Sequence, residues 1–187
     1  MDLVKLPSWS AGNQEVIAFV RDVHNDYGHE YEYLESLEQM NAYDSNTGLK
    51  NRISYNRKIR QLDISPEQVG VVYCDLNGLK VINDTQGHAA GDRYISSFAH
   101  ILTDYFRPLE CYKIGGDEFI VITCGMSENL FIERTEAFIS NINRMPIPIA
   151  SVGVFYGVGI NRCISEAEKN MYKNKTEFYK NHPAYKR

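Results

Sequence analysis

The sequence predicts a mixed α/β domain in which helices surround a buried central sheet. Residues 69–74 form a continuous apolar run rich in β-branched side chains, which is typical of a strand buried on both faces. Residues 111–123 contain two apolar runs joined by Gly115 and Gly116, and this pattern predicts a β-hairpin whose glycines adopt positive φ angles. Other segments repeat apolar residues every three or four positions, which is the spacing of amphipathic helices.

Length and charge limit the classes of function. The 187 residues suffice for one domain with a complete core and a short N-terminal extension. A composition of 43% hydrophobic and 24% charged residues is that of ordinary globular proteins. The net charge of -4 argues against duplex nucleic acid as the main partner, because phosphate backbones attract clustered Lys and Arg. A small anionic ligand, held by a local basic cluster and a metal ion, fits this charge balance.

The cysteines and the N-terminus indicate a compartment. The four cysteines form no C-x-x-C pair, which argues against a zinc site and for a reduced, cytoplasmic protein. The N-terminus lacks the apolar core of a signal peptide. The longest apolar stretch, residues 145–160, is interrupted by Pro146 and Pro148, so we predict a turn and a strand there instead of a membrane span.

Residues 27–40 predict an amphipathic helix with an acidic face. Its apolar stripe consists of Tyr27, Tyr31, Leu34, Leu37 and Met40, and four glutamates lie between them. The stripe suits packing on the helix's own domain or the pairing of two chains as the end of a coiled coil. Fewer than three heptads are visible, so the pattern leaves both interpretations open.

Residues 44–84 predict a turn, a helix, a strand and a loop, in that order. Residues 44–48 form a dense turn cluster, and residues 49–62 predict a basic-faced helix that turns Leu49, Ile53, Ile59 and Leu62 inward. Asp75 follows the buried strand directly, at a position where ligands gather in mixed α/β proteins. Residues 76–84 predict a loop and a short helical turn. The fragment Asp75-x-Asn77-Gly78 begins like a calcium-binding loop, but the twelve-residue pattern with its closing Glu is absent.

The second half of the chain predicts three further helices and a strand. Residues 87–92 predict a turn, with Asp92 as the N-cap or first-turn acid of a helix that runs to about Phe106, and we expect a structural hydrogen bond for His88. After the hairpin, a helix begins at Ser127 and ends at Met145. A strand over 149–156 and a lysine-bearing helix from Ser165 follow.

Two carboxylates are predicted to converge. Asp75 ends the buried strand and Asp117 lies at the hairpin turn, so the two side chains meet if these strands are neighbours. Convergent carboxylates without nearby His or Cys favour Mg²⁺, which leaves coordination positions for water and nucleotide phosphates. This chemistry suits phosphoryl or nucleotidyl transfer.

These residues also resemble a known family. Gly115-Gly116-Asp117-Glu118-Phe119 is similar to the name-giving motif of the GGDEF family of diguanylate cyclases. Residues 44–52 resemble the family's entry motif D-x-L-T-G-L-x-N-R, and residues 75–84 resemble D-x-D-x-F-K-x-x-N-D. Further matches, in the family's order, are Gly87-His88 with Gly91-Asp92, then 151–153, and then 167–175. The resemblance covers about 42–179, and we predict an N-terminal extension with a signalling helix over 1–41 and a GGDEF domain over 42–187.

The resemblance implies a fold and an activity. The fold would be palm-like, a nucleotide-cyclase fold with a central, mainly antiparallel five-stranded sheet flanked by helices. The activity would be the condensation of two GTP molecules into cyclic di-GMP and two pyrophosphates. Each of two facing domains would hold one GTP, so catalysis would need a homodimer. The segment before residue 44 resembles the end of an upstream sensory domain.

The resemblance also implies roles for individual residues. Asp75 and Asp117, with the Leu76 carbonyl, would bind Mg²⁺ or Mn²⁺, and Asn83 and Asp92 would hydrogen-bond the guanine. Glu118 would assist the metal site or the deprotonation of the attacking hydroxyl. The phosphates would be held by Lys80, Lys175 and the amides around Gly78 and Leu79.

Several positions depart from the family pattern. Asn77, Leu79 and Lys113 stand where Asp, Phe and Arg are frequent. Tyr179 stands where a second phosphate-binding Arg is common and Phe178 where Gly is common, which predicts weaker phosphate binding. The inhibitory motif R-x-x-D is altered, because residues 107–110 end in Glu and are separated from the glycine pair by a spacer of four residues instead of five. We therefore expect no high-affinity product-inhibition site.

Two alternatives to this activity stay open. The first is a catalytically weak or inactive domain that binds GTP or dimerises in order to regulate an attached partner. The second is an altered product, such as a mixed purine dinucleotide. The intact Asp75, Asn83, Asp92, Asp117 and Glu118 favour catalysis.

Overall fold

The computed structural model describes residues 42–65, 67–145 and 149–185. The helix predicted over 27–40 and the extension predicted over 1–41 lie outside these residues, so the division of the chain at residue 42 stays a prediction. None of the helices in the described part is both long and apolar enough to cross a membrane.

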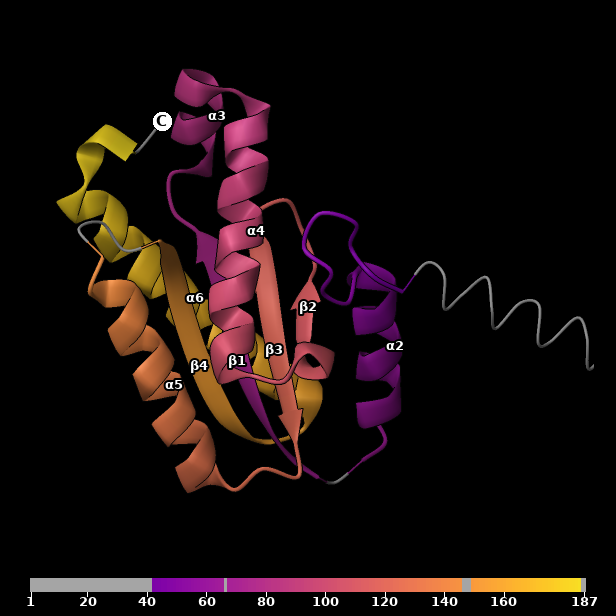
Figure 1. The fold of residues 1–187 in the computed structure, drawn as a ribbon. Coiled ribbons are helices and arrows are strands. Elements are labelled where there is room, and N and C mark those ends of the chain that lie inside the picture. Colours follow the sequence, from indigo (N-terminus) through magenta and orange to yellow (C-terminus); the bar gives the residue numbers. More distant parts are fainter. Residues whose placement is uncertain (1–41, 66, 146–148, 186–187) are drawn as a thin grey trace, which may run out of the picture. The chain divides into compact units, whose positions relative to one another are not determined.

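An antiparallel sheet forms the centre of the domain (Figure 1). Its strands, in the order β2-β3-β1-β4, are β2 (Cys111–Lys113), β3 (Glu118–Cys124), β1 (Gln68–Leu76) and β4 (Ala150–Val158). Every neighbouring pair is antiparallel. All residues of β1 except Gln68 are buried, which confirms the prediction of a central strand covered on both faces.

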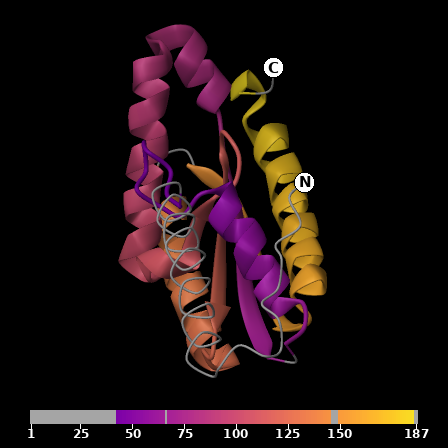
Figure 2. The same ribbon diagram turned by 90° about the vertical axis from the view of Figure 1, so that its right-hand side faces the viewer.

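Helices cover both faces of the sheet, as Figure 2 shows with α4 and α6 on opposite sides. The core on one face joins the sheet to α4 (His88–Tyr105) and α5 (Glu128–Asn143), and it includes Val72 and Cys74 of β1. The core on the other face joins it to α2 (Arg52–Leu62) and α6 (Ile160–Asn181), and it includes Val71 and Tyr73. Successive side chains of β1 therefore alternate between the two cores. The remaining elements are α3 (Leu79–Gln86), η1 (Pro108–Glu110) and η2 (Pro183–Tyr185).

The sheet has four strands in the described residues, so the expected five-stranded sheet is wrong in number although its antiparallel character is confirmed. After β4 the chain turns at Gly159 directly into α6, which continues to Asn181. Little described chain is then left to extend the sheet beyond β4. Beside β2, Lys50 contributes only an isolated parallel bridge with Tyr112.

Several helix boundaries differ from the prediction. The first helix begins at Arg52 and not at residue 49, because the Asn51 side chain accepts hydrogen bonds from the amides of Ile53 and Ser54. Ile53 is 48% exposed, so its predicted inward position is wrong. The predicted turn over 87–92 is largely helical, because only Gly87 has a positive φ and α4 begins at His88. The last helix begins at Ile160, five residues before the predicted Ser165.

Gly153 determines how closely α6 approaches the sheet. A Cβ atom at this position would overlap the carbonyl oxygen of Ala167 and the backbone nitrogen of Met171. The helix backbone therefore lies directly on β4, and this contact requires a residue without a side chain. The close approach brings the later residues of α6 toward the end of β1.

Candidate functional site

The acidic residues meet where β1 ends and the hairpin turns. Asp75 lies opposite Glu118 in the β1–β3 register. The amide of Leu76 donates a hydrogen bond of 2.9 Å to the carbonyl oxygen of Asp117. The predicted hairpin is thus a neighbour of the buried strand, and the backbone brings Asp75, Asp117 and Glu118 to one end of the sheet.

Asp75 is a buried carboxylate that is only partly satisfied. Its side chain is 6% exposed, and its Oδ2 lies 2.7 Å from the Nζ of Lys175. Its Oδ1 is buried and has no hydrogen-bond partner among the described residues. Burial raises the pKa of Asp75 above its usual range, although the hydrogen bond and charge of Lys175 lower it in part and the charges of Asp117 and Glu118 raise it further.

Lys175 of α6 lies next to the acidic residues and forms an ion pair with Asp75. Burial lowers its pKa, but the hydrogen bond and charge of Asp75 outweigh burial, so the pKa is raised. The side chain is 26% exposed and therefore retains contact with water. Lys175 therefore contacts the predicted site and is not only a solvent-exposed lysine of the last helix.

Glu118 is held from two sides. One carboxylate oxygen accepts a hydrogen bond of 3.1 Å from the hydroxyl of Tyr73. The other lies 2.5 Å from the point where a Cβ of Gly115 would be. The prediction that the glycines supply positive φ angles is wrong, because neither Gly115 nor Gly116 has one. Gly115 instead leaves room for the Glu118 side chain.

The donors at this end of the sheet suit a hard cation with few protein ligands. A buried carboxylate oxygen without a partner, beside a second carboxylate, offers the oxygen donors that Mg²⁺ prefers. In the described part of the chain, no group of three or more His, Cys, Asp or Glu side chains is arranged to hold a metal.

A pocket of about 370 Å³ opens beside the acidic residues. The hairpin lines it with Gly116 and Asp117, and the helices α3 and α4 line it with Leu79, Lys80, Asn83, Asp84 and His88. The structural hydrogen bond expected for His88 is absent among the described residues, and this side chain is exposed at the pocket instead. Asp84 and His88 are lining residues that sequence reasoning did not select.

Asn83 reaches the pocket because Gly91 has no side chain. A Cβ on Gly91 would overlap the Oδ1 of Asn83, so this glycine permits close contact between α3 and α4. Asp92 follows Gly91, is exposed and lies one turn into α4, where it caps nothing. Asp92 does not line the pocket, although it is adjacent to the residue that Asn83 contacts.

The loop after β1 is held in place by buried hydrogen bonds and by aromatic packing. Gly78 precedes α3 and has a φ of 71°. This left-handed backbone conformation favours glycine. The ring of Tyr185 packs against it, with Cδ1 2.5 Å from the position of a Cβ. Asn77 is buried and its Oδ1 accepts a 2.7 Å hydrogen bond from the hydroxyl of Ser151. The carbonyl of Asn77 also accepts a hydrogen bond from Tyr94.

An aromatic cluster occupies the end of α6, where the family pattern has Gly and Arg. Phe178 is buried, stacks on His182 at 4.6 Å and contacts Tyr179 and Tyr185. The contact with Phe178 holds the ring of Tyr185 against Gly78. Phe178 and Tyr179, which differ from the family pattern, therefore form aromatic contacts and place no cationic side chain beside the loop.

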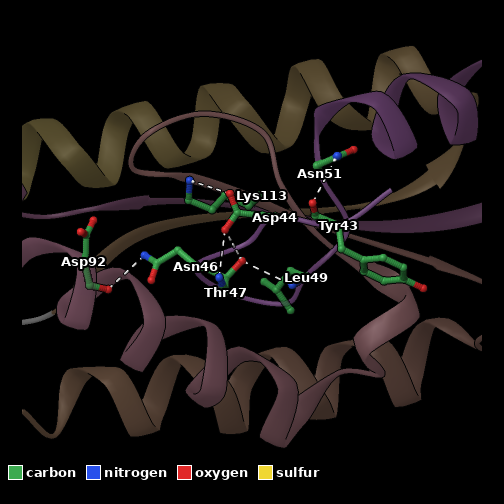
Figure 3. Close-up of polar contacts among 8 residues, drawn as sticks. All are labelled: Tyr43, Asp44, Asn46, Thr47, Leu49, Asn51, Asp92 and Lys113. Carbon is green, nitrogen blue, oxygen red and sulfur yellow. Dashed lines mark hydrogen bonds and ion pairs between the residues drawn. The ribbon is translucent and has the colours of Figure 1, made fainter. Parts of the chain in front are cut away.

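The turn over 44–48 connects the hairpin to α4 (Figure 3). The Asp44 carboxylate accepts hydrogen bonds from the amide and hydroxyl of Thr47 and lies 3.4 Å from the Nζ of Lys113. Burial opposes ionisation of Asp44, but these hydrogen bonds and Lys113 lower its pKa. Asn46 donates to the carbonyl of Asp92. Lys113, at the position where Arg is frequent in the family pattern, thus forms an ion pair with the turn in this chain.

A known protein family and several known proteins are similar in sequence to this chain. The family model described as "Diguanylate cyclase, GGDEF domain" matches residues 41–181. An uncharacterized protein in the hutH 5'region of Streptomyces griseus is 37% identical over 101 residues, which cover 50% of this chain and 42% of that protein. Diguanylate cyclase DgcS of Shewanella oneidensis is 30% identical over 96 residues, which cover 49% of this chain and 32% of DgcS. The chain therefore matches less than half the length of each of these relatives.

The fold is shared with a solved structure. A crystal structure of the coiled coil and GGDEF domain of DgcB from Caulobacter crescentus, in complex with c-di-GMP, aligns with a TM-score of 0.66 at 18% identity. The alignment covers 87% of this chain and 95% of that one. This likeness supports the palm-like, α+β fold.

Proposed function

Because the chain belongs to the diguanylate cyclase GGDEF domain family, we propose that it condenses two GTP molecules into cyclic di-GMP and two pyrophosphates. The observation that carries this proposal is the buried Asp75, whose unpartnered oxygen lies at the same end of the sheet as Asp117 and Glu118, beside a pocket. The 3′-hydroxyl oxygen of one GTP attacks the α-phosphorus of the other, and the bond to pyrophosphate breaks as the hydroxyl proton leaves. A second, identical exchange closes the ring.

The carboxylates would hold the divalent ion. Asp75, Asp117 and the Leu76 carbonyl would bind Mg²⁺, or Mn²⁺ in its place, while Glu118 orients the site or accepts the hydroxyl proton. The bound ion would neutralise charge that develops on the α-phosphate and the leaving pyrophosphate. Lys175 pairs with Asp75 at 2.7 Å. Its remaining contact with water allows it to turn from Asp75 to a phosphate oxygen when the carboxylate binds the ion.

The pocket would hold the nucleotide. Asn83 lines it and would hydrogen-bond the guanine edge together with Asp92, which lies next to the Gly91 that Asn83 contacts. Lys80 lines the same pocket and would bind phosphate with the amides of Gly78 and Leu79. Because each chain supplies one reactant, two chains must face each other as a homodimer. An upstream sensory domain and a cytoplasmic location remain predictions.

A concentration series tests the activity. Incubating the chain with GTP and Mg²⁺ over a wide range of protein concentrations is expected to give cyclic di-GMP, identified by chromatography, with a rate per chain that rises with concentration. Omitting the divalent ion should stop synthesis, and adding Mn²⁺ should restore it. Binding of GTP with no dinucleotide at any concentration would contradict the proposal. ATP added with GTP tests the mixed-product alternative.

The aromatic cluster favours a second candidate function, a weak or inactive domain that binds GTP and regulates a partner. Phe178 and Tyr179 replace residues of the family's phosphate-binding pattern, and Tyr185 packs on Gly78. Tight GTP binding without product, even when two domains are joined by a fused coiled coil, would support this candidate instead.

Product inhibition is expected to be absent. Glu110 stands where the inhibitory motif has Asp, and its carboxylate accepts a hydrogen bond of 3.3 Å from the amide of Arg107. This contact holds the carboxylate against its own turn, η1, instead of directing it toward a ligand. We expect synthesis to continue unchanged when micromolar cyclic di-GMP is added at the start. An Arg107→Ala variant should behave like the parent, and product inhibition that this substitution relieves would contradict the prediction.

A further inference from the structure

Tyr73 lies beside the acidic residues but belongs to none of the motifs described above. It precedes Asp75 by two positions on β1, so both side chains point to the face that α2 and α6 cover. The phenol ring is buried, and its hydroxyl donates a hydrogen bond of 3.1 Å to Oε1 of Glu118. Tyr73 pairs with Ile120 in the β1–β3 register, so the contact with Glu118 is diagonal across the two strands.

The contact fixes one orientation of the Glu118 carboxylate. The phenol holds one oxygen, and the other lies over Gly115, 2.5 Å from the position that a Cβ would take. An ionised carboxylate only accepts hydrogen bonds, so the phenol must be the donor. Burial raises the pKa of Tyr73, and the charge and hydrogen bond of Glu118 raise it further.

We infer that Tyr73 is a positioning residue that orients the Glu118 carboxylate toward the metal and the attacking hydroxyl of the proposed reaction. The inference rests on the proposed function and adds a residue to it. A carboxylate that ligates a metal or accepts a proton works only in a narrow range of orientations, and a neighbour that hydrogen-bonds it supplies that restraint. Without the phenol, the Glu118 side chain keeps its charge but can rotate away from Gly115.

The test compares Tyr73→Phe with Tyr112→Phe. Tyr112 is a buried tyrosine of the same core, and its hydroxyl makes no hydrogen bond within the described residues. Tyr73→Phe is expected to lower kcat on the order of tenfold, the typical effect of one hydrogen bond to a charged group, with KM for GTP changed less than about twofold. The Mg²⁺ concentration for half-maximal rate should rise by a similar factor of about ten. Tyr112→Phe should leave all three quantities within about twofold.

A second measurement does not depend on turnover. The affinity of the chain for Mn²⁺ in the presence of a non-hydrolysable GTP analogue, read by electron paramagnetic resonance, is expected to fall in Tyr73→Phe and not in Tyr112→Phe. In a Glu118→Gln background, Tyr73→Phe should cause no further loss, because its effect passes through Glu118. Gly115→Ala offers a route that leaves Tyr73 intact, since its Cβ would displace the same carboxylate.

The outcomes separate the two proposals. A parent chain that makes no cyclic dinucleotide overturns the proposed function, whereas the Mn²⁺ measurements still decide the role of Tyr73. Tyr73→Phe with parental kcat, Mg²⁺ dependence and Mn²⁺ affinity overturns the inference alone. The inference is also overturned if Tyr73→Phe and Glu118→Gln have additive effects on Mn²⁺ affinity. If Tyr73→Phe does not fold, Gly115→Ala must show the expected loss of Mn²⁺ affinity for the inference to hold.

Discussion

Asp75→Asn is expected to reduce cyclic di-GMP synthesis on the order of a thousandfold while leaving the melting temperature equal to that of the parent or higher. In the proposed reaction Asp75 would bind the metal, so its loss would remove several kcal/mol of transition-state stabilisation, and each factor of ten in rate corresponds to about 1.4 kcal/mol. The product yield and the thermal denaturation curve of the same preparation check both parts.

The expected stability follows from the direction of the pKa shift. Because the pKa of Asp75 is raised in the folded chain, folding favours its protonated form. The stability that this group contributes is fully present below its unfolded pKa and is lost as the pH rises through its folded pKa. At pH values above its folded pKa the buried charge therefore opposes folding, and asparagine removes that charge at nearly the same volume. Lys175, 26% exposed, can turn to water when it loses its partner.

The control for this substitution is Asp104→Asn, which removes a charge from an exposed position of α4. It should change neither synthesis nor the melting temperature measurably. Addition of Mg²⁺ with a GTP analogue should raise the melting temperature of the parent and of Asp104→Asn, but not that of Asp75→Asn. Substantial synthesis by Asp75→Asn, or a melting temperature many degrees below that of the parent, would contradict the role given to Asp75.

Gly153→Ala is expected to destabilise the domain by about 3 kcal/mol, which is large for the addition of one methyl group. The new Cβ would overlap backbone atoms of Ala167 and Met171, and a helix backbone cannot move aside as a flexible side chain can. The helix must shift as a unit, and Lys175 shifts with it, so synthesis should fall even at temperatures where the variant is folded. Urea denaturation measures the free energy of unfolding.

Gly157→Ala on the same strand provides the matched control. There the nearest atom to the added Cβ is Cε1 of the Phe155 ring, at 3.1 Å, which is a side-chain atom and can move. We expect a loss below about 1 kcal/mol and normal synthesis. Equal denaturation midpoints for the two variants would show that the approach of α6 to β4 is not the constraint that the structure indicates.

Much of the fold was predictable because it depends on local patterns. The β-branched run predicted β1, the paired apolar runs predicted the hairpin, and the three- and four-residue spacings predicted the helices. The predicted positions of helix ends were less accurate, because a capping side chain or a single glycine decides where a helix begins. Asn51 capped a helix expected to begin at residue 49, and residues 88–92 continued as a helix where a turn was expected. The expected fifth strand came from the family resemblance, and the described residues do not form it.

The sequence by itself determined the family and the convergence of Asp75 with the acidic hairpin, because motif spacing and strand pattern are local properties of the chain. Only the tertiary structure decided which groups restrain those carboxylates. Lys175 reaches Asp75 across 100 positions, and Tyr73 reaches Glu118 across 45. Such contacts arise from the packing of distant elements, here from the absence of a side chain at Gly153 and at Gly115. No periodicity along the chain records them, since each depends on how closely two backbones or side chains approach in space.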